Sequence, residues 1–139
     1  MTEFEKELML IEKTGLKTSP QRLEYEKKVC ELRSMPEKLK AEGYTEDQIA
    51  RAMHEKRREL GRQYKEAAPP LLREYIYDAT AAKYGDPLGP TYEMLRKKKT
   101  CKQIIESASR PIEDLNNRLT LEGFRQWYLT HKNGNGDVR

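Results

Sequence analysis

Apolar residues recur at helical spacing along most of this 139-residue chain, and no alternating run of β-branched residues is long enough to predict a strand. The clearest case follows Thr45, where Ile49, Met53, Leu60 and Tyr64 share one face of a helix. The pattern predicts an all-α protein, folded as a compact bundle of about five to seven helices.

Capping signals set the expected ends of these helices. The pairs Thr45/Gln48 and Thr100/Gln103 each match a capping box, and the Ser19-Pro20 step is a further helix start. The expected helices cover residues 20–34, 46–66, 71–83, 92–98, 101–109 and 120–131, with a charged, weakly amphipathic stretch at 1–14 and a short element from Pro111.

The chain has the length of one domain, and its charge is unevenly distributed. The first fifty residues carry nine Lys and Arg against eleven Asp and Glu, whereas residues 51–110 carry fourteen against eight. We expect a single domain over residues 1–139, with an acidic helical segment at 1–44, a basic helical core at 45–131 and a frayed tail at 132–139. The basic middle favours a polyanion such as nucleic acid as partner. The alternative is a solvated helix surface with excess lysine.

Several classes of protein lack their signatures here. No run of about 20 apolar residues would span a bilayer, and the acidic N-terminus is unlike a secretory signal, so we expect a soluble domain with no membrane partner. Cys30 and Cys101 have no Cys or His at metal-ligand spacing, and the phosphate-loop, dinucleotide, zinc-protease and serine-hydrolase motifs are missing. We therefore expect no metal and no cofactor.

Residues 84–91, YGDPLGPT, hold two glycines and two prolines, which predicts a shaped loop rather than a flexible linker. Tyr84, Asp86 and Thr91, with Arg96 one turn into the next helix, are expected to lie within reach of one another. Such a group would orient a phosphate and move a proton. In the alternative, Asp86 and Thr91 cap the loop and its helix, Tyr84 packs, and Arg96 is solvated.

His54 is the stronger catalytic candidate of the two histidines, because His131 falls close to the frayed terminus. The charges of the neighbouring arginines would lower the pKa of His54 and keep it neutral as a base. The alternative is an exposed histidine among charges. The faces opposite the apolar stripe of this helix are expected to carry its arginines: Arg51, Arg57, Arg58 and Arg62.

Residues 83–111, KYGDPLGPTYEMLRKKKTCKQIIESASRP, resemble a motif of the C-terminal toxic domains of bacterial polymorphic toxins, the contact-dependent inhibition and Rhs-type effectors. The preceding KEAAPPLLREYIY is also similar. The chain departs from the motif at Lys98-Lys99-Thr100-Cys101, where the family has Gly-Lys-Ser-Trp, and at Ile112-Glu113, where it has two glycines.

The resemblance implies a toxin domain at the end of a larger secreted effector. It would act in the cytoplasm of a neighbouring bacterium, be neutralised by a cognate immunity protein and, in some cases, need a host activating factor. Toxins of this kind often attack transfer RNA, and we expect a metal-independent RNA nuclease. Proton transfer would fall to Asp86, Tyr84 or His54 and base stacking to Tyr77 or Tyr92, while phosphate would be bound by Arg58, Arg62, Arg96, Lys99 and Arg110.

Two other functions fit the same residues. A non-enzymatic helical module would use the charged helices to recognise a protein and would turn nothing over. A basic nucleic-acid-binding domain would bind with an affinity that falls steeply with salt, without cleavage.

Overall fold

The computed structural model describes residues 1–15, 19–110 and 120–133. Within these ranges the regular structure is helical and no strand occurs, which confirms the all-α class. In chain order the elements are α1 (Glu3–Thr14), α2 (Pro20–Glu31), η1 (Leu32–Ser34), α3 (Met35–Ala41), α4 (Glu46–Glu66), α5 (Pro70–Tyr84), α6 (Tyr92–Arg96), α7 (Cys101–Ala108), α9 (Leu121–Tyr128) and η2 (Leu129–Asn133).

The caps expected from the sequence are present. The backbone N–H of Gln48 donates to Thr45 Oγ1 at 3.2 Å, and that of Thr45 donates to Gln48 Oε1 at 2.9 Å. Thr100 and Gln103 form the same reciprocal pair, and Ser19 caps α2 with Pro20 in its first turn. These local bonds fix where the helices begin.

Two expected boundaries are wrong. The α-helix that we expected over residues 20–34 ends earlier, at Glu31, and the chain passes through η1 into α3, a helix that we did not expect and that has Pro36 in its first turn. Proline is tolerated at this place because a first-turn N–H has no intrahelical partner. The last α-helix, expected to reach about residue 131, ends at Tyr128, and η2 continues the helical path to Asn133. The element expected from Pro111, and residues 134–139 of the expected tail, lie outside the described residues.

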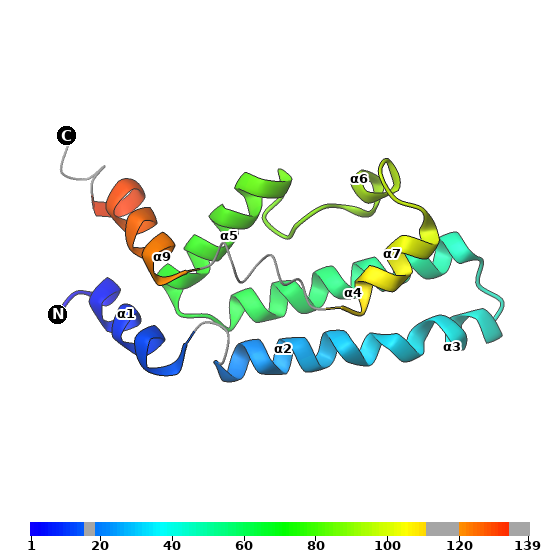
Figure 1. Cartoon of the computed structure of the whole chain (residues 1–139), viewed down its shortest axis with the longest axis horizontal. Helices are drawn as coiled ribbons and strands as arrows, with labels where there is room; N and C mark the ends of the chain where they lie inside the picture. Colours follow the sequence, from blue (N-terminus) through cyan, green and yellow to red (C-terminus); the bar gives the residue numbers. More distant parts are fainter. Residues whose placement is uncertain (16–18, 111–119, 134–139) are drawn as a thin grey trace.

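α4 is the central helix of the molecule (Figure 1). α2 and α3 run along one side of it and α7 along another, and α6 packs near its N-terminal end. The apolar stripe expected on α4 is buried in this contact: Ile49 and Met53 pack with Val29 of α2 and Ala108 of α7. α4 therefore presents its remaining faces to α5 and to the loop at residues 85–91.

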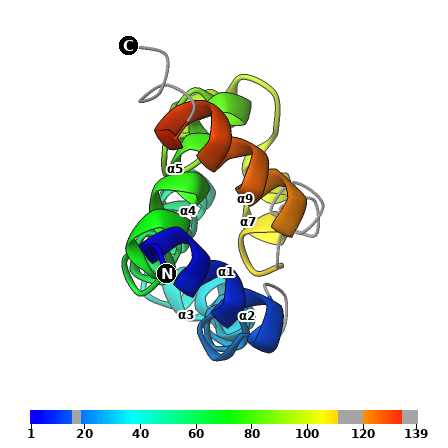
Figure 2. The same ribbon diagram turned by 90° about the vertical axis from the view of Figure 1, so that its left-hand side faces the viewer.

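A second core joins α1, α5 and α9 at the end of the molecule where the N-terminus lies (Figure 2). Phe4 of α1 packs against Phe124 of α9, with ring centroids 5.0 Å apart, and both belong to one buried cluster with Ile76 of α5. The acidic first helix is thus part of the core, although its sequence gave only a weak apolar pattern.

Glu7 joins α1 to α5. Its two carboxylate oxygens accept the backbone N–H groups of Leu71 (3.0 Å) and Leu72 (2.8 Å) at the start of α5. The residue before that helix is Pro69, whose side chain makes no cap. A buried side chain from a distant helix therefore satisfies the free N–H groups of α5.

No helix of the described ranges is both long enough and apolar enough to cross a bilayer.

Candidate functional site

The loop between α5 and α6 has the defined shape that its glycines and prolines predict. Gly85 ends α5 in the left-handed conformation (φ 78°), and Gly89 also has a positive φ of 92°. Asp86 Oδ1 accepts the backbone N–H of Leu88 at 2.8 Å, which closes a turn inside the loop. Side chains with a Cβ rarely adopt these φ values, so both glycines are needed for the path of the loop.

Two residues of α4 hold this loop. Arg58 donates to the carbonyls of Gly89 (2.7 Å) and Pro90 (3.1 Å), and its guanidinium lies 3.4 Å from Asp86 Oδ1. His54 Nε2 lies 2.7 Å from the oxygen of Pro90. These two side chains therefore hold the loop at residues 85–91, which we call the motif loop, against α4. More than thirty residues separate His54 from Pro90 along the chain.

A cavity of about 260 Å³ lies between α4, α5, this loop and the end of α7. We call it the basic cavity, because the described residues that line it include no Asp or Glu. Five of them carry basic side chains: His54, Arg57, Arg58, Lys65 and Lys99. Hydroxyl groups also contribute, from Tyr25, Thr80, Tyr84 and Ser107. A pocket with this lining is suited to an anion.

Lys65 is the most unusual residue of the basic cavity. Only 7% of it is exposed, and its Nζ lies 3.6 Å from the position that a Cβ on Gly61 would take. It forms no hydrogen bond or ion pair with another described residue, and its Nζ lies 6.0 Å from the centroid of the Tyr77 ring. Burial, and then the charges of Arg58, Arg22 and Arg57, lower the pKa of Lys65 to about 8.

Arg57 is buried to the same degree, although we expected it on a face opposite the apolar stripe of α4. This expectation is wrong because Arg57 lies four residues after Met53 and three before Leu60, which is the spacing of one helix face. Its Nε donates to the Tyr25 hydroxyl at 3.2 Å, and its Nη1 donates to the carbonyls of Ser107 (3.1 Å) and Ala108 (2.9 Å). Its Nη2 is buried with no hydrogen-bond partner among the described residues.

His54 is buried, not exposed. Burial is the main cause that lowers the pKa of His54, and the charges of Arg58 and Arg57 lower it further. The imidazole is therefore neutral near pH 7. Because a carbonyl only accepts, the Nε2 bonded to Pro90 carries the proton, and Nδ1 is left as the acceptor of the neutral ring.

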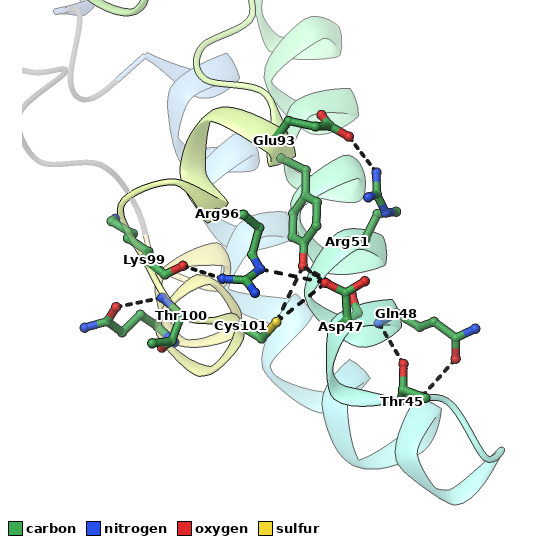
Figure 3. Close-up of polar contacts among 11 residues, drawn as sticks. Thr45, Asp47, Gln48, Arg51, Glu93, Arg96, Lys99, Thr100 and Cys101 are labelled. Atoms are coloured by element: carbon green, nitrogen blue, oxygen red, sulfur yellow. Dashed lines mark hydrogen bonds and ion pairs between the residues drawn. The ribbon is translucent and has the colours of Figure 1, made fainter.

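A separate polar cluster joins α4 to α6 and α7, and Figure 3 shows its labelled members. The buried Tyr92 donates its hydroxyl to Asp47 Oδ1 at 2.6 Å, and Cys101 Sγ lies 3.6 Å from the same oxygen. Arg96 Nε lies 3.8 Å from Asp47 Oδ1, and Arg96 Nη1 donates to the Lys99 carbonyl at 2.9 Å. The Tyr92 hydrogen bond is the main cause that lowers the pKa of Asp47. The cluster fastens α6 and α7 to the start of α4.

The residues of the expected loop site are therefore divided between different surroundings. His54, Arg58, Tyr84 and Lys99 line the basic cavity, and Asp86 borders it through Arg58. Thr91 caps α6 by accepting the Met94 N–H at 3.2 Å, and Arg96 belongs to the Asp47 cluster. Tyr84 and Asp86 thus remain near one another, while the side chains of Thr91 and Arg96 are bound elsewhere.

The other expected nucleic-acid contacts lie outside the basic cavity. Arg62 pairs with Glu59 on the surface of α4, and the Tyr77 hydroxyl donates to Glu66 at 2.8 Å. Tyr92 is 4% exposed, with the Arg51 guanidinium 4.5 Å from its ring centroid, so a base has no free face to stack on in this conformation. Arg110 is exposed just beyond α7.

Two residues of the basic cavity, Arg57 and Lys65, were missed from the sequence. The helical spacing of Met53, Arg57 and Leu60 is a signal that does predict burial of Arg57. Lys65 follows Gly61 by four residues, and a glycine within a helix leaves room for the side chain one turn later. The burial of Lys65 also depends on α5 and on the loop, which no local pattern on α4 indicates.

A larger hollow of about 340 Å³ lies between α2 and α4. It is lined mainly by apolar and amide side chains, including Tyr25, Leu60 and Tyr64, and its charged members, Glu24 and Lys28, have opposite signs and pair with each other. It does not gather charge of one sign, and we regard the basic cavity as the candidate site. Among the described residues, no group of three or more His, Cys, Asp and Glu could hold a metal ion.

No protein-family model matches the chain, and comparison with curated proteins and with solved structures finds no significant match.

Proposed function

We propose that this chain is the RNA-cleaving domain of an antibacterial toxin and that its reaction takes place at the basic cavity. The observation that carries the proposal is the lining of the cavity, in which basic side chains face the motif loop and no carboxylate of a described residue takes part. RNA supplies the complementary charge at every phosphate. The resemblance of residues 83–111 to polymorphic-toxin domains supports the same assignment.

The proposed reaction is attack of a ribose 2′-oxygen on the adjacent phosphorus. The P–O5′ bond breaks, giving a 2′,3′-cyclic phosphate and a 5′-hydroxyl. The neutral His54 takes the proton of the 2′-hydroxyl at Nδ1, and the Tyr84 phenol gives a proton to the leaving oxygen. Lys99 and Arg58 stabilise the charge on the phosphorane, and Asp86 holds Arg58 in place. Exchange with water restores both protonation states.

The biological setting is also a proposal. The domain would be carried at the end of a secreted effector and act in the cytoplasm of a neighbouring cell, with transfer RNA as its substrate. An immunity protein that covers the basic cavity would protect the producing cell. Such a protein would be acidic where it contacts the lining.

One observation favours a function without cleavage. His54 bonds to the carbonyl of Pro90, and Arg58 donates to the carbonyls of Gly89 and Pro90. These contacts are the ones expected if the role of both residues were to hold the loop. The second candidate is therefore a nucleic-acid-binding module that uses the same cavity and turns nothing over.

Expression of the chain in bacteria without an immunity protein separates the two. We expect growth arrest together with discrete RNA fragments on a denaturing gel, and we expect both to disappear with Arg58→Met and Lys99→Met combined. Lys27→Met and Lys38→Met, at exposed positions of α2 and α3, are the matched control for lost charge. Arrest with intact RNA would leave a toxin that is not a ribonuclease, and normal growth with soluble protein would favour the binding module.

A further inference from the structure

The inner part of the basic cavity contains two positively charged side chains, Lys65 and Arg57, that are not bonded to the loop. Arg58 and His54 are bonded to loop carbonyls, whereas Lys65 forms no hydrogen bond or ion pair with a described residue. Arg57 adds a buried Nη2 without a partner in the described part of the chain. Both residues are 7% exposed, and both line the cavity.

Positive charge in this setting is costly to the folded protein. An ammonium that is largely removed from water loses much of its hydration and needs an anion or several acceptors in return. The described groups around Lys65 provide neither a free anion nor such a set of acceptors. The charges of Arg57 and Arg58, on the same helix as Lys65, and of Arg22 on α2 are also positive. The carboxylate of Asp86, in the loop, favours the charged form of Lys65 but is already paired with Arg58. The Tyr77 ring of α5 is 6.0 Å away.

We propose that Lys65 and Arg57 form a subsite for one phosphate group of single-stranded RNA. The unpaired ammonium and guanidinium supply the two kinds of donor that phosphate binds best. In naming RNA as the source of the phosphate, this inference rests on the proposed function. The binding of phosphate itself does not depend on cleavage.

The size of the cavity limits what can enter with the phosphate. At about 260 Å³ it is smaller than the roughly 300–1,000 Å³ of pockets that enclose drug-sized ligands. It has room for a phosphate and part of one nucleotide. A base-paired nucleotide would not fit, so the substrate must present an unpaired, flexible phosphodiester, as in the loop of a transfer RNA.

The pKa of Lys65 provides a direct test, since an anion beside the ammonium favours its charged form. NMR of the lysine ε-methylenes would follow this titration with and without inorganic phosphate. We expect phosphate to raise the titration midpoint of Lys65 by one unit or more. A midpoint that phosphate does not move would overturn the subsite.

A paired variant extends the test to nucleic acid. Lys65→Met keeps most of the length of the side chain and removes the charge, so it should fold, and Lys56→Met on the outer face of α4 is its control. The probe is a single-stranded oligodeoxynucleotide, which has phosphates but no 2′-hydroxyl and is therefore bound without being cut. We expect Lys65→Met to weaken its binding at least tenfold and Lys56→Met to change it less than threefold.

The outcomes separate this inference from the proposed function. Phosphate binding lost in Lys65→Met, in a protein that leaves RNA intact, would keep the subsite and reject the nuclease. RNA cleavage with phosphate and oligonucleotide binding unchanged in Lys65→Met would keep the nuclease and reject the subsite. Equal losses in Lys65→Met and Lys56→Met would also reject it, because general charge would then account for the binding.

Discussion

His54 holds the motif loop through one ring nitrogen and leaves the other as a proton acceptor. Substitution His54→Gln separates the two roles, because a glutamine amide can still donate to the Pro90 carbonyl but cannot take a proton. We expect RNA cleavage to fall by a factor of about 10² to 10⁴, the usual contribution of a general base. Single-turnover cleavage rates and thermal melting together would measure this.

The control for this substitution is His131→Gln, at the exposed histidine of η2. It should leave the cleavage rate unchanged. Wild-type cleavage by His54→Gln would mean that the histidine serves only to hold the loop.

Lys65 should make stability depend on pH in an identifiable way. Its pKa is about 8 in the folded protein against 10.5 ordinarily, so below pH 8 its full cost to folding is present. The cost is lost as the pH rises through the folded pKa towards the unfolded one. We expect Lys65→Met to be more stable than wild type at pH 7, by about 2 to 3 kcal/mol, and this difference to shrink by pH 10.

Urea denaturation of both proteins at several pH values gives this difference directly, and the contributions of other titrating groups cancel in it. A difference that stays constant between pH 7 and pH 10 would show that Lys65 is not a buried charge in solution.

At the scale of single residues, sequence reasoning succeeded where the cause is local. Thr91, Thr45 and Thr100 are caps because their side chains reach N–H groups three residues away. It failed for Lys65 because that burial requires α5 and the loop to fold over the side chain, and both come later in the chain.

The attachment of α1 depends on one carboxylate. Substitution Glu7→Ala would leave two N–H groups at the start of α5 without acceptors. Each unsatisfied buried donor costs about 1 to 3 kcal/mol, and we expect a loss of roughly 2 to 4 kcal/mol in the free energy of unfolding. Chemical denaturation would measure it.

Glu24→Ala on the exposed surface of α2 is the matched control, and should change the free energy of unfolding by less than about 0.5 kcal/mol. Glu7→Gln keeps one acceptor and should fall between the two. A loss no greater in Glu7→Ala than in the control would mean that α1 is not docked through this residue.

At the scale of helices, composition and caps predicted most of the elements because each signal lies within a few residues of the feature that it causes. The continuation of α2 through η1 into α3 was not predicted, since proline at position 36 can end a helix or begin one. The packing α1 makes with α5 and α9 was also missed. Its buried positions, Phe4, Glu7 and Ile11, include a carboxylate, which masks the apolar stripe.

For the whole molecule, charge should govern the binding of RNA. Lys99 lines the basic cavity, and the neighbouring Lys97, Lys98 and Lys102 are exposed. We expect the logarithm of the association constant for single-stranded RNA to fall linearly with the logarithm of salt concentration. Each lost phosphate contact should reduce that slope by about 0.7, so Lys98→Met combined with Lys99→Met should reduce it by about 1.4.

The control for the salt series is Lys27→Met combined with Lys38→Met, which removes the same charge from α2 and α3. Fluorescence anisotropy with a labelled RNA would give the slopes. Equal slopes for wild type and the Lys98, Lys99 variant would place the RNA elsewhere.

The all-α class followed from the sequence because helical periodicity runs through most of the chain. The assembly of the basic cavity could not be predicted in the same way. His54 meets Pro90, and Arg57 meets the end of α7 fifty residues later, and both contacts depend on how α4 is surrounded. Sequence reasoning named the loop and the histidine separately and did not pair them.

The most direct test of the central claim is cleavage of RNA by the purified chain in the presence of a metal chelator. Bacterial transfer RNA would be the substrate, and the ends of the products would be identified chemically. We expect discrete fragments with 2′,3′-cyclic phosphate and 5′-hydroxyl ends, formed by wild type and His131→Gln and not by His54→Gln. Transfer RNA that stays intact with a folded wild-type protein, or that His54→Gln cuts as fast, would contradict a nuclease centre at the basic cavity.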